Sequence, residues 1–169
     1  MLATYKDYPF GGNRFTEYTI DHMVDFVRRG QRKPEIVKVA REIVINCPPK
    51  DYYCEAETIF QWIKDNIRYT RDPLNAEWLQ EPDVTLREGQ ADCDCSAVLM
   101  ASLCAAIGMQ TGFEAIRSER NYPDEFSHVY PIVQTSQGWR AADTSVAESS
   151  LGWRPEAGVF GRRIFINRG

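Results

Sequence analysis

Two cysteines lie two residues apart in the segment ADCDCSA (residues 91–97), at the start of a long apolar run. Thiols in this arrangement could bind a metal, form a redox pair, or supply one nucleophile with a second thiol beside it. A familiar redox pair has two intervening residues, and here there is only one. A zinc site built from Cys93, Cys95, Cys104 and His128 matches none of the usual paired-ligand spacings. The spacing therefore favours a nucleophile, with no metal site.

A thiol in the first turn of a helix is a candidate nucleophile, because the free N–H groups and the helix dipole lower its pKa. We expect a helix to begin at Asp92 or Cys93 and to end at Gly108, apolar on nearly every side, which is typical of a central buried helix. Cys93 lies in a row of small or apolar residues, whereas the row of Cys95 is interrupted by Ser102. This difference favours Cys93 as the sulfur that faces the strands that follow.

The sequence also offers a base and a group to orient it, both of which a catalytic thiol requires. Only two histidines occur, His22 and His128. His22 lies on a polar helix face, where we expect no catalytic role. His128 lies in a predicted strand at 127–134, and Asp143 lies in the next one, at 139–144.

The turn between these two strands determines whether His128 and Asp143 can meet. If Ser136 and Gln137 form the turn, Asp143 lies opposite Tyr130, and His128 is its diagonal neighbour on the same face. A slip of one residue in this register would move Asp143 to the opposite face. The pattern therefore predicts a Cys93, His128 and Asp143 triad that depends on one register.

The other elements follow from periodicity and from helix and turn signals. Apolar spacing predicts helices before the Cys93 helix and antiparallel strands after it, so the fold class is α+β with segregated elements. We expect a short helical turn in the irregular 70–91 stretch, at 76–80. The predicted helices are 19–29, 34–46 and 52–67, and the remaining predicted strands are 110–116 and 159–167.

Length and composition place the chain among ordinary soluble globular proteins. It has 169 residues, of which 43% are hydrophobic and 26% charged. We expect an extended arm at 1–16 and a single domain at 17–169. A net charge of −4 argues against binding to nucleic acid, and the basic run at 28–33 is better explained as a helix C-terminus. No apolar run reaches the length of a membrane span.

The five cysteines are an odd number in a chain that is not small, so a disulfide scaffold is not expected. Reduced thiols and the lack of a signal-peptide pattern at the N-terminus favour the cytoplasm.

Taken together, these motifs resemble the transglutaminase-like superfamily, which shares the papain-related fold. The resemblance covers residues 55–155. Upstream, Ile67-Arg68-Tyr69 and Asp72-Pro73, and the Leu79-Gln80 and Pro82 that follow, resemble a small subgroup encoded by phages and prophages. This resemblance implies the cytoplasm of a host cell, with association with a virion as an alternative. The residues that carry the main resemblance are Cys93 with Ala97, Ile107 with Gly108, His128 with Val129, and Trp139 with Asp143.

Three positions depart from the family pattern. Ala91 stands where the family usually has Gly, and Thr144 and Ser145 follow Asp143 where Pro is common. Cys95 occupies a position that is often a carboxylate, which changes the electrostatics near the thiol. None of these changes removes a predicted catalytic group.

The resemblance implies a cysteine-dependent hydrolase or acyltransferase that acts on amide bonds of peptides or peptidoglycan and needs no cofactor. The Cys93 thiolate would attack the carboxamide, and water or an amine would release the thioester. Trp78, Gln80 and Cys95 are candidates for oxyanion or substrate contacts. The alternative is a non-catalytic structural or assembly component of a phage particle with the same fold, with phage structural proteins as partners.

Overall fold

Helix α5 (Cys93–Ala106) is the buried centre of the fold. The ten residues from Cys95 to Cys104 are all buried. Asp92 caps the helix, because its side chain accepts a hydrogen bond from the Cys95 N–H at 2.8 Å. The predicted start of this helix and its central position are therefore confirmed.

The computed structural model describes residues 4–6, 13–72, 77–118, 120–121, 123–155 and 162–166, and these contain a mixture of helices and strands. The other helices are α1 (Asn13–Gly30), α2 (Pro34–Ile43), α3 (Tyr52–Asn66) and α4 (Pro82–Glu88). The strands are β1 (Thr4–Lys6), β2 (Arg68–Tyr69), β3 (Glu77–Leu79), β4 (Gln90–Ala91), β5 (Thr111–Ile116), β6 (His128–Thr135), β7 (Gly138–Ala141) and β8 (Arg162–Ile166).

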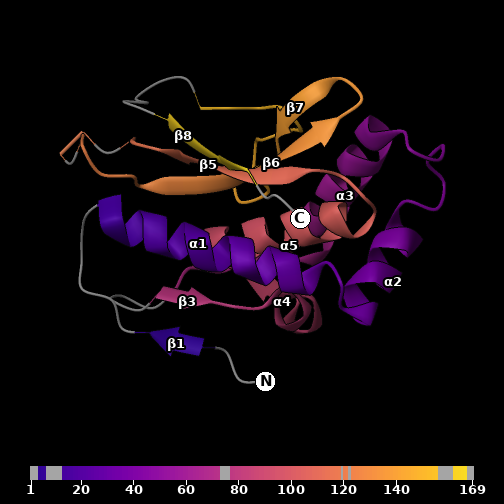
Figure 1. Cartoon of the computed structure of the whole chain (residues 1–169), viewed down its shortest axis with the longest axis horizontal. Helices are drawn as coiled ribbons and strands as arrows, with labels where there is room; N and C mark the ends of the chain where they lie inside the picture. Colours follow the sequence, from indigo (N-terminus) through magenta and orange to yellow (C-terminus); the bar gives the residue numbers. More distant parts are fainter. Residues whose placement is uncertain are drawn as a thin grey trace.

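The main sheet is antiparallel and has the strand order β7-β6-β5-β8. Figure 1 shows this sheet as one layer over α1 and α5, with α4 and the β1-β3 pair on the far side of these helices. Strand β6 uses both of its faces: Val129 packs with residues of α5, whereas Tyr130 and Ile132 belong to a separate apolar cluster. The architecture confirms the predicted α+β class.

The register of the β6-β7 hairpin is the one that the sequence predicts. Thr135 pairs with Gly138, and Ile132 pairs with Ala141. The ladder continues one residue further, because the Ala142 N–H donates to the Pro131 carbonyl at 2.9 Å. Asp143 therefore follows the hairpin on the side of the sheet that His128 occupies.

The segment between α3 and α5 differs from the prediction. The expected helical turn at 76–80 is wrong, since Glu77–Leu79 is strand β3, which pairs with β1. Helix α4 was not predicted, although its signals are present. Pro82 occupies its first turn, and Gly89 ends it in a left-handed conformation with φ of 64°.

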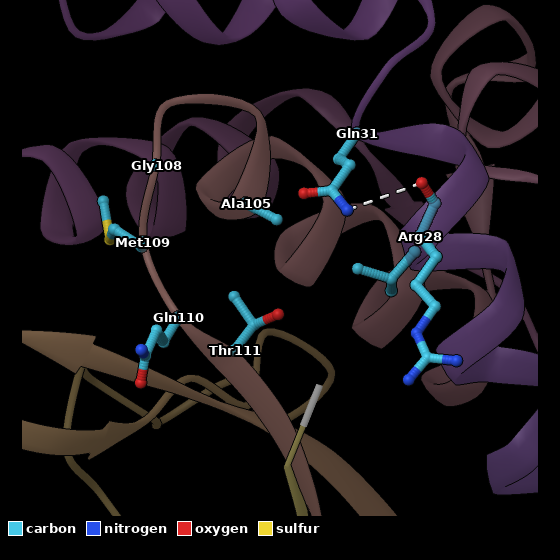
Figure 2. Close-up of a pocket in the computed structure, with 8 residues that line it drawn as sticks. Arg28, Gln31, Ala105, Gly108, Met109, Gln110 and Thr111 are labelled. Carbon is cyan, nitrogen blue, oxygen red and sulfur yellow. Dashed lines mark hydrogen bonds between the residues drawn. The ribbon is translucent and has the colours of Figure 1, made fainter. Parts of the chain in front are cut away.

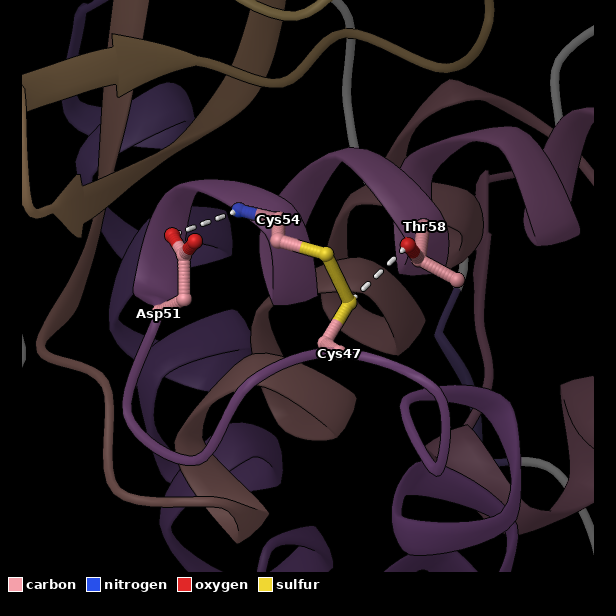
Figure 3. Close-up of a disulfide and its surroundings, with 4 residues drawn as sticks. All are labelled: Cys47, Asp51, Cys54 and Thr58. Carbon is pink, nitrogen blue, oxygen red and sulfur yellow. Dashed lines mark hydrogen bonds between the residues drawn. A yellow bond between two sulfur atoms is a disulfide. The ribbon is translucent and has the colours of Figure 1, made fainter.

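A disulfide between Cys47 and Cys54 joins the end of the α2 region to the first turn of α3 (Figure 3). The expectation of reduced thiols throughout the chain is therefore wrong at this pair. Cys47 and Cys54 are seven positions apart, and the turn between them ends at Asp51, which caps α3 by accepting the Cys54 N–H. The N-cap brings the two sulfurs together. Cys93, Cys95 and Cys104 remain free thiols.

None of the helices in the described part of the chain combines the length and the hydropathy that crossing a bilayer requires.

We expect this disulfide to stabilise the α2-α3 corner by closing a short loop in the unfolded chain, which corresponds to about 2 kcal/mol. A Cys47→Ser/Cys54→Ser double variant should melt at a lower temperature than the wild type in calorimetry. Dithiothreitol should lower the melting temperature of the wild type and leave that of the double variant unchanged. Equal sensitivity of both proteins to the reductant would contradict the disulfide.

Candidate active site

Cys93 is the first residue of α5, and its side chain is half-buried. Its thiol donates a hydrogen bond to Asp94 Oδ1 at 3.4 Å. Burial raises the pKa of this thiol, and the negative charges of Asp94, Asp92 and Asp143 raise it further. The predicted lowering of the pKa by the helix N-terminus is therefore outweighed by desolvation and by neighbouring carboxylates. The surroundings of Cys93 therefore favour the neutral thiol over the thiolate.

Cys95 has a different environment, although it lies only two residues further along. It is 2% exposed, and its thiol donates to the Trp78 carbonyl at 3.0 Å while accepting the Gln80 N–H at 3.3 Å. Both contacts are to the backbone in and beside strand β3. Cys95 thus fastens β3 to α5, and its sulfur does not face the same surroundings as that of Cys93.

His128 and Asp143 form a direct pair. His128 Nε2 lies 2.6 Å from Asp143 Oδ2, and the exposed fractions of their side chains are 22% and 3%. The other carboxylate oxygen, Oδ1, accepts the Ser145 N–H at 3.1 Å and the Ser145 hydroxyl at 2.6 Å. Because Nε2 is occupied by Asp143, Nδ1 is the ring nitrogen left for a second partner.

The pair shifts the pKa values of both partners. Burial alone would lower the pKa of His128, but the hydrogen bond and charge of Asp143 outweigh it and raise that pKa. Burial would raise the pKa of Asp143, but His128 and Ser145 lower it. The protonated imidazole therefore stabilises the fold below the ordinary histidine pKa, and this contribution is lost as the pH rises through the raised value.

Cys93 belongs to the same electrostatic cluster as this pair. The charge of Asp143 acts on the Cys93 thiol, and the charge of Asp94 acts on both Cys93 and His128. The N-terminus of α5 and the open end of the β6-β7 hairpin thus place a thiol, an imidazole and two carboxylates within electrostatic range of one another. Asp94 was not predicted as part of this site, and its only sequence signal is its position next to Cys93.

Trp78 and Gln80 contact Cys95 through their backbones, on the β3 side of α5. The Gln80 side chain is engaged with α4: its amide nitrogen donates to Glu88 at 3.0 Å, and its oxygen accepts the Thr85 hydroxyl at 3.2 Å. These bonds argue against Gln80 as a side-chain oxyanion donor. The Trp78 N–H of the backbone donates to Asp72 at 2.6 Å, which fixes the position of its strand.

No group of three or more His, Cys, Asp or Glu residues within the described ranges is arranged to hold a metal ion. A cavity of about 190 Å³ does exist, but at the opposite end of α5, where Ala105, Met109 and Thr111 line it (Figure 2). Ala105 lies about 18 Å along the helix axis from Cys93. This cavity is therefore separate from the cluster around Cys93.

Comparison with known proteins identifies the architecture. The family model described as the transglutaminase-like superfamily matches residues 37–144. A candidate protease from Parabacteroides distasonis superposes with a TM-score of 0.58 and 12% identity, over 78% of this chain and 27% of its own. A candidate cysteine protease from Cytophaga hutchinsonii gives a TM-score of 0.56 and 20% identity, over 85% of this chain and 51% of its own.

The chain thus spans about a quarter and about half of the lengths of these two proteins. At such low identities the similarity shows the fold alone. No curated protein matches the sequence significantly. The resemblance to a phage-encoded subgroup remains a prediction.

Replacing Asp143 with Asn should lower the pKa of His128, because the anion that favours the imidazolium is removed. The measurement is an NMR titration of the imidazole resonances, with His22 as an internal reference in the same spectra. Asp124→Asn, which removes an exposed carboxylate from the loop before β6, is the matched control and should leave the titration in place. An unchanged His128 titration in the Asp143 variant would contradict the pair.

Proposed function

Because the chain belongs to the transglutaminase-like superfamily, we propose that it is a cysteine-dependent hydrolase or acyltransferase that cleaves amide bonds. Cys93 is the nucleophile, His128 the base and acid, and Asp143 the group that orients the imidazole. The observation that carries the proposal is the 2.6 Å contact between His128 Nε2 and Asp143 Oδ2, in one electrostatic cluster with the Cys93 thiol.

The neutral state of the thiol determines how the reaction begins. Because burial and the carboxylates around Cys93 disfavour its thiolate, the neutral form of His128, which predominates above its raised pKa, takes the thiol proton at Nδ1 as the sulfur attacks the amide carbon. Asp143 stabilises the imidazolium that forms. His128 then returns the proton to the leaving amine, and the acyl group remains on Cys93 as a thioester. Water releases it in a hydrolase, and a second amine releases it in an acyltransferase.

The oxyanion of the tetrahedral intermediate needs hydrogen-bond donors. The backbone N–H of Cys93 is one, because the first N–H groups of a helix have no partner within the helix. The indole N–H of Trp78 is the second candidate, since the Gln80 amide is engaged with Glu88. Cys95 supports this arrangement indirectly by holding β3 against α5.

The substrate class is an amide of a peptide or of peptidoglycan. The names of the two structural neighbours, a candidate protease and a candidate cysteine protease, support amide bond cleavage by this fold. The non-catalytic alternative, a phage-particle component, predicts a Cys93 with ordinary thiol reactivity, so the chemistry of this one sulfur separates the two functions.

Alkylation by iodoacetamide tests the nucleophile without a known substrate. We expect modification of Cys93, mapped by peptide mass spectrometry, at a rate that increases as the pH rises through the raised pKa of His128 and the imidazole becomes neutral. The rate should fall about a hundredfold in His128→Ala, where the base is missing. Cys95 and Cys104 in the same sample are buried internal references and should remain unmodified. A slow Cys93 whose rate does not depend on His128 would overturn the proposed function.

A trapped thioester would test the substrate class. We expect acid quenching after incubation with purified peptidoglycan or with a mixture of peptides to leave an acyl adduct on Cys93, detected as an increase in intact mass. The Cys93→Ala variant should show no adduct. Adduct formation by this variant would place the nucleophile elsewhere.

A further inference from the structure

A hydroxyl pair joins the nucleophile helix to the segment that carries Asp143. Ser96 Oγ and Thr144 Oγ1 lie 2.6 Å apart, and the two residues are 48 positions apart in sequence. Ser96 is 5% exposed, so this bond forms in a largely dry environment. The contact is therefore a tertiary link between two separate segments of the chain.

The positions of the two hydroxyls place this link next to the proposed triad. Ser96 is three residues after Cys93 on α5, and helix residues at this spacing are neighbours on one face. Thr144 directly follows Asp143. This hydrogen bond therefore connects the two segments that carry the outer members of the proposed triad, Cys93 on α5 and Asp143 after β7.

The choice of partner is informative for a serine inside a helix. Such a serine commonly bonds to a carbonyl in the preceding turn of its own helix. The Ser96 hydroxyl contacts Thr144 across the interface instead. Because both hydroxyls are uncharged, the link adds no charge that would shift the pKa of the nearby thiol or imidazole.

The segment that follows Asp143 is also held from another direction. Lys64 of α3 donates to the carbonyls of Val146, Ala147 and Ser149 at 3.0, 2.8 and 2.8 Å. The Ser149 hydroxyl donates to the Asp143 carbonyl at 2.5 Å. The far end of this segment is thus fixed to α3, whereas the Ser96 contact fixes its near end to α5.

We propose, on the basis of the proposed function, that Ser96 and Thr144 are positioning residues. Their hydrogen bond holds Cys93 in the position relative to the His128-Asp143 pair from which proton transfer to Nδ1 can occur. Neither hydroxyl reacts with substrate in this scheme.

The test compares three variants by the rate of Cys93 alkylation with iodoacetamide across pH 5 to 9. Thr144→Val keeps the shape of the side chain and removes its hydroxyl, and Ser96→Ala removes the other hydroxyl. Both should lower the Cys93 rate at pH 7 by at least about fivefold, the factor that corresponds to one ordinary hydrogen bond. Thr144→Ser retains a hydroxyl and should stay close to the wild-type rate.

Ser102→Ala provides the matched control. Ser102 is a buried hydroxyl on the same helix, and its Oγ has no hydrogen-bond partner among the described residues. Its removal should leave the Cys93 pH profile unchanged. Melting temperatures of all variants, measured alongside, identify any rate loss caused by unfolding.

The outcomes separate this proposal from the one on which it rests. Rapid wild-type alkylation that depends on His128, together with an unchanged profile in Thr144→Val and Ser96→Ala, would overturn the positioning role alone. A change in melting temperature without a change in the profile would do the same. Slow wild-type alkylation that does not depend on His128 would overturn the proposed function, and the positioning role with it.

Discussion

The register of the β6-β7 hairpin is the constraint on which the site depends. Side chains alternate between the faces of a strand, so a shift of one residue would turn Asp143 away from His128. The turn after Thr135 and the pairing of Ile132 with Ala141 fix this register several residues away from the site. The position of the His128-Asp143 pair relative to α5 therefore follows from backbone pairing in the hairpin and from the packing of Val129 against α5.

A second constraint is the unusual number of carboxylates around one thiol. Burial and the charge of Asp94 raise the pKa of Asp92 to about 7, although the carboxyl still caps α5 through the Cys95 N–H. The same charges disfavour a Cys93 thiolate and favour a protonated His128. The first effect disfavours an ion pair between a Cys93 thiolate and a His128 imidazolium, whereas the second effect favours it. Above its raised pKa, neutral His128 can remove the thiol proton during attack, which avoids the cost of maintaining an isolated thiolate among anions.

The sequence predicts those parts of the fold that local pattern determines. The start of α5 at Asp92 or Cys93, its apolar character and the β6-β7 turn all carry strong local signals, and the structure confirms them. Helix α4 was missed although Pro82 and Gly89 are local signals for it, whereas β3 depends on a contact between distant segments, because β1 pairs with it. The Cys47-Cys54 bond needs the α2-α3 corner, and cysteine counting cannot show it. The raised pKa of Cys93 likewise depends on burial, which no residue spacing reveals.

The fold also keeps the thiols apart, which matters for a chain that has one disulfide and a proposed sulfur nucleophile. Residues two apart on a helix point in nearly opposite directions, so Cys93 and Cys95 cannot pair unless the first turn of α5 unwinds. The two hydrogen bonds of Cys95 to the β3 region oppose such unwinding. The cysteines of the disulfide lie between α2 and α3 and are joined to each other. Pairing of Cys93 with Cys95 would therefore require the helix that positions Cys93 to unwind, and Cys93 is a free thiol in a molecule that also contains one disulfide.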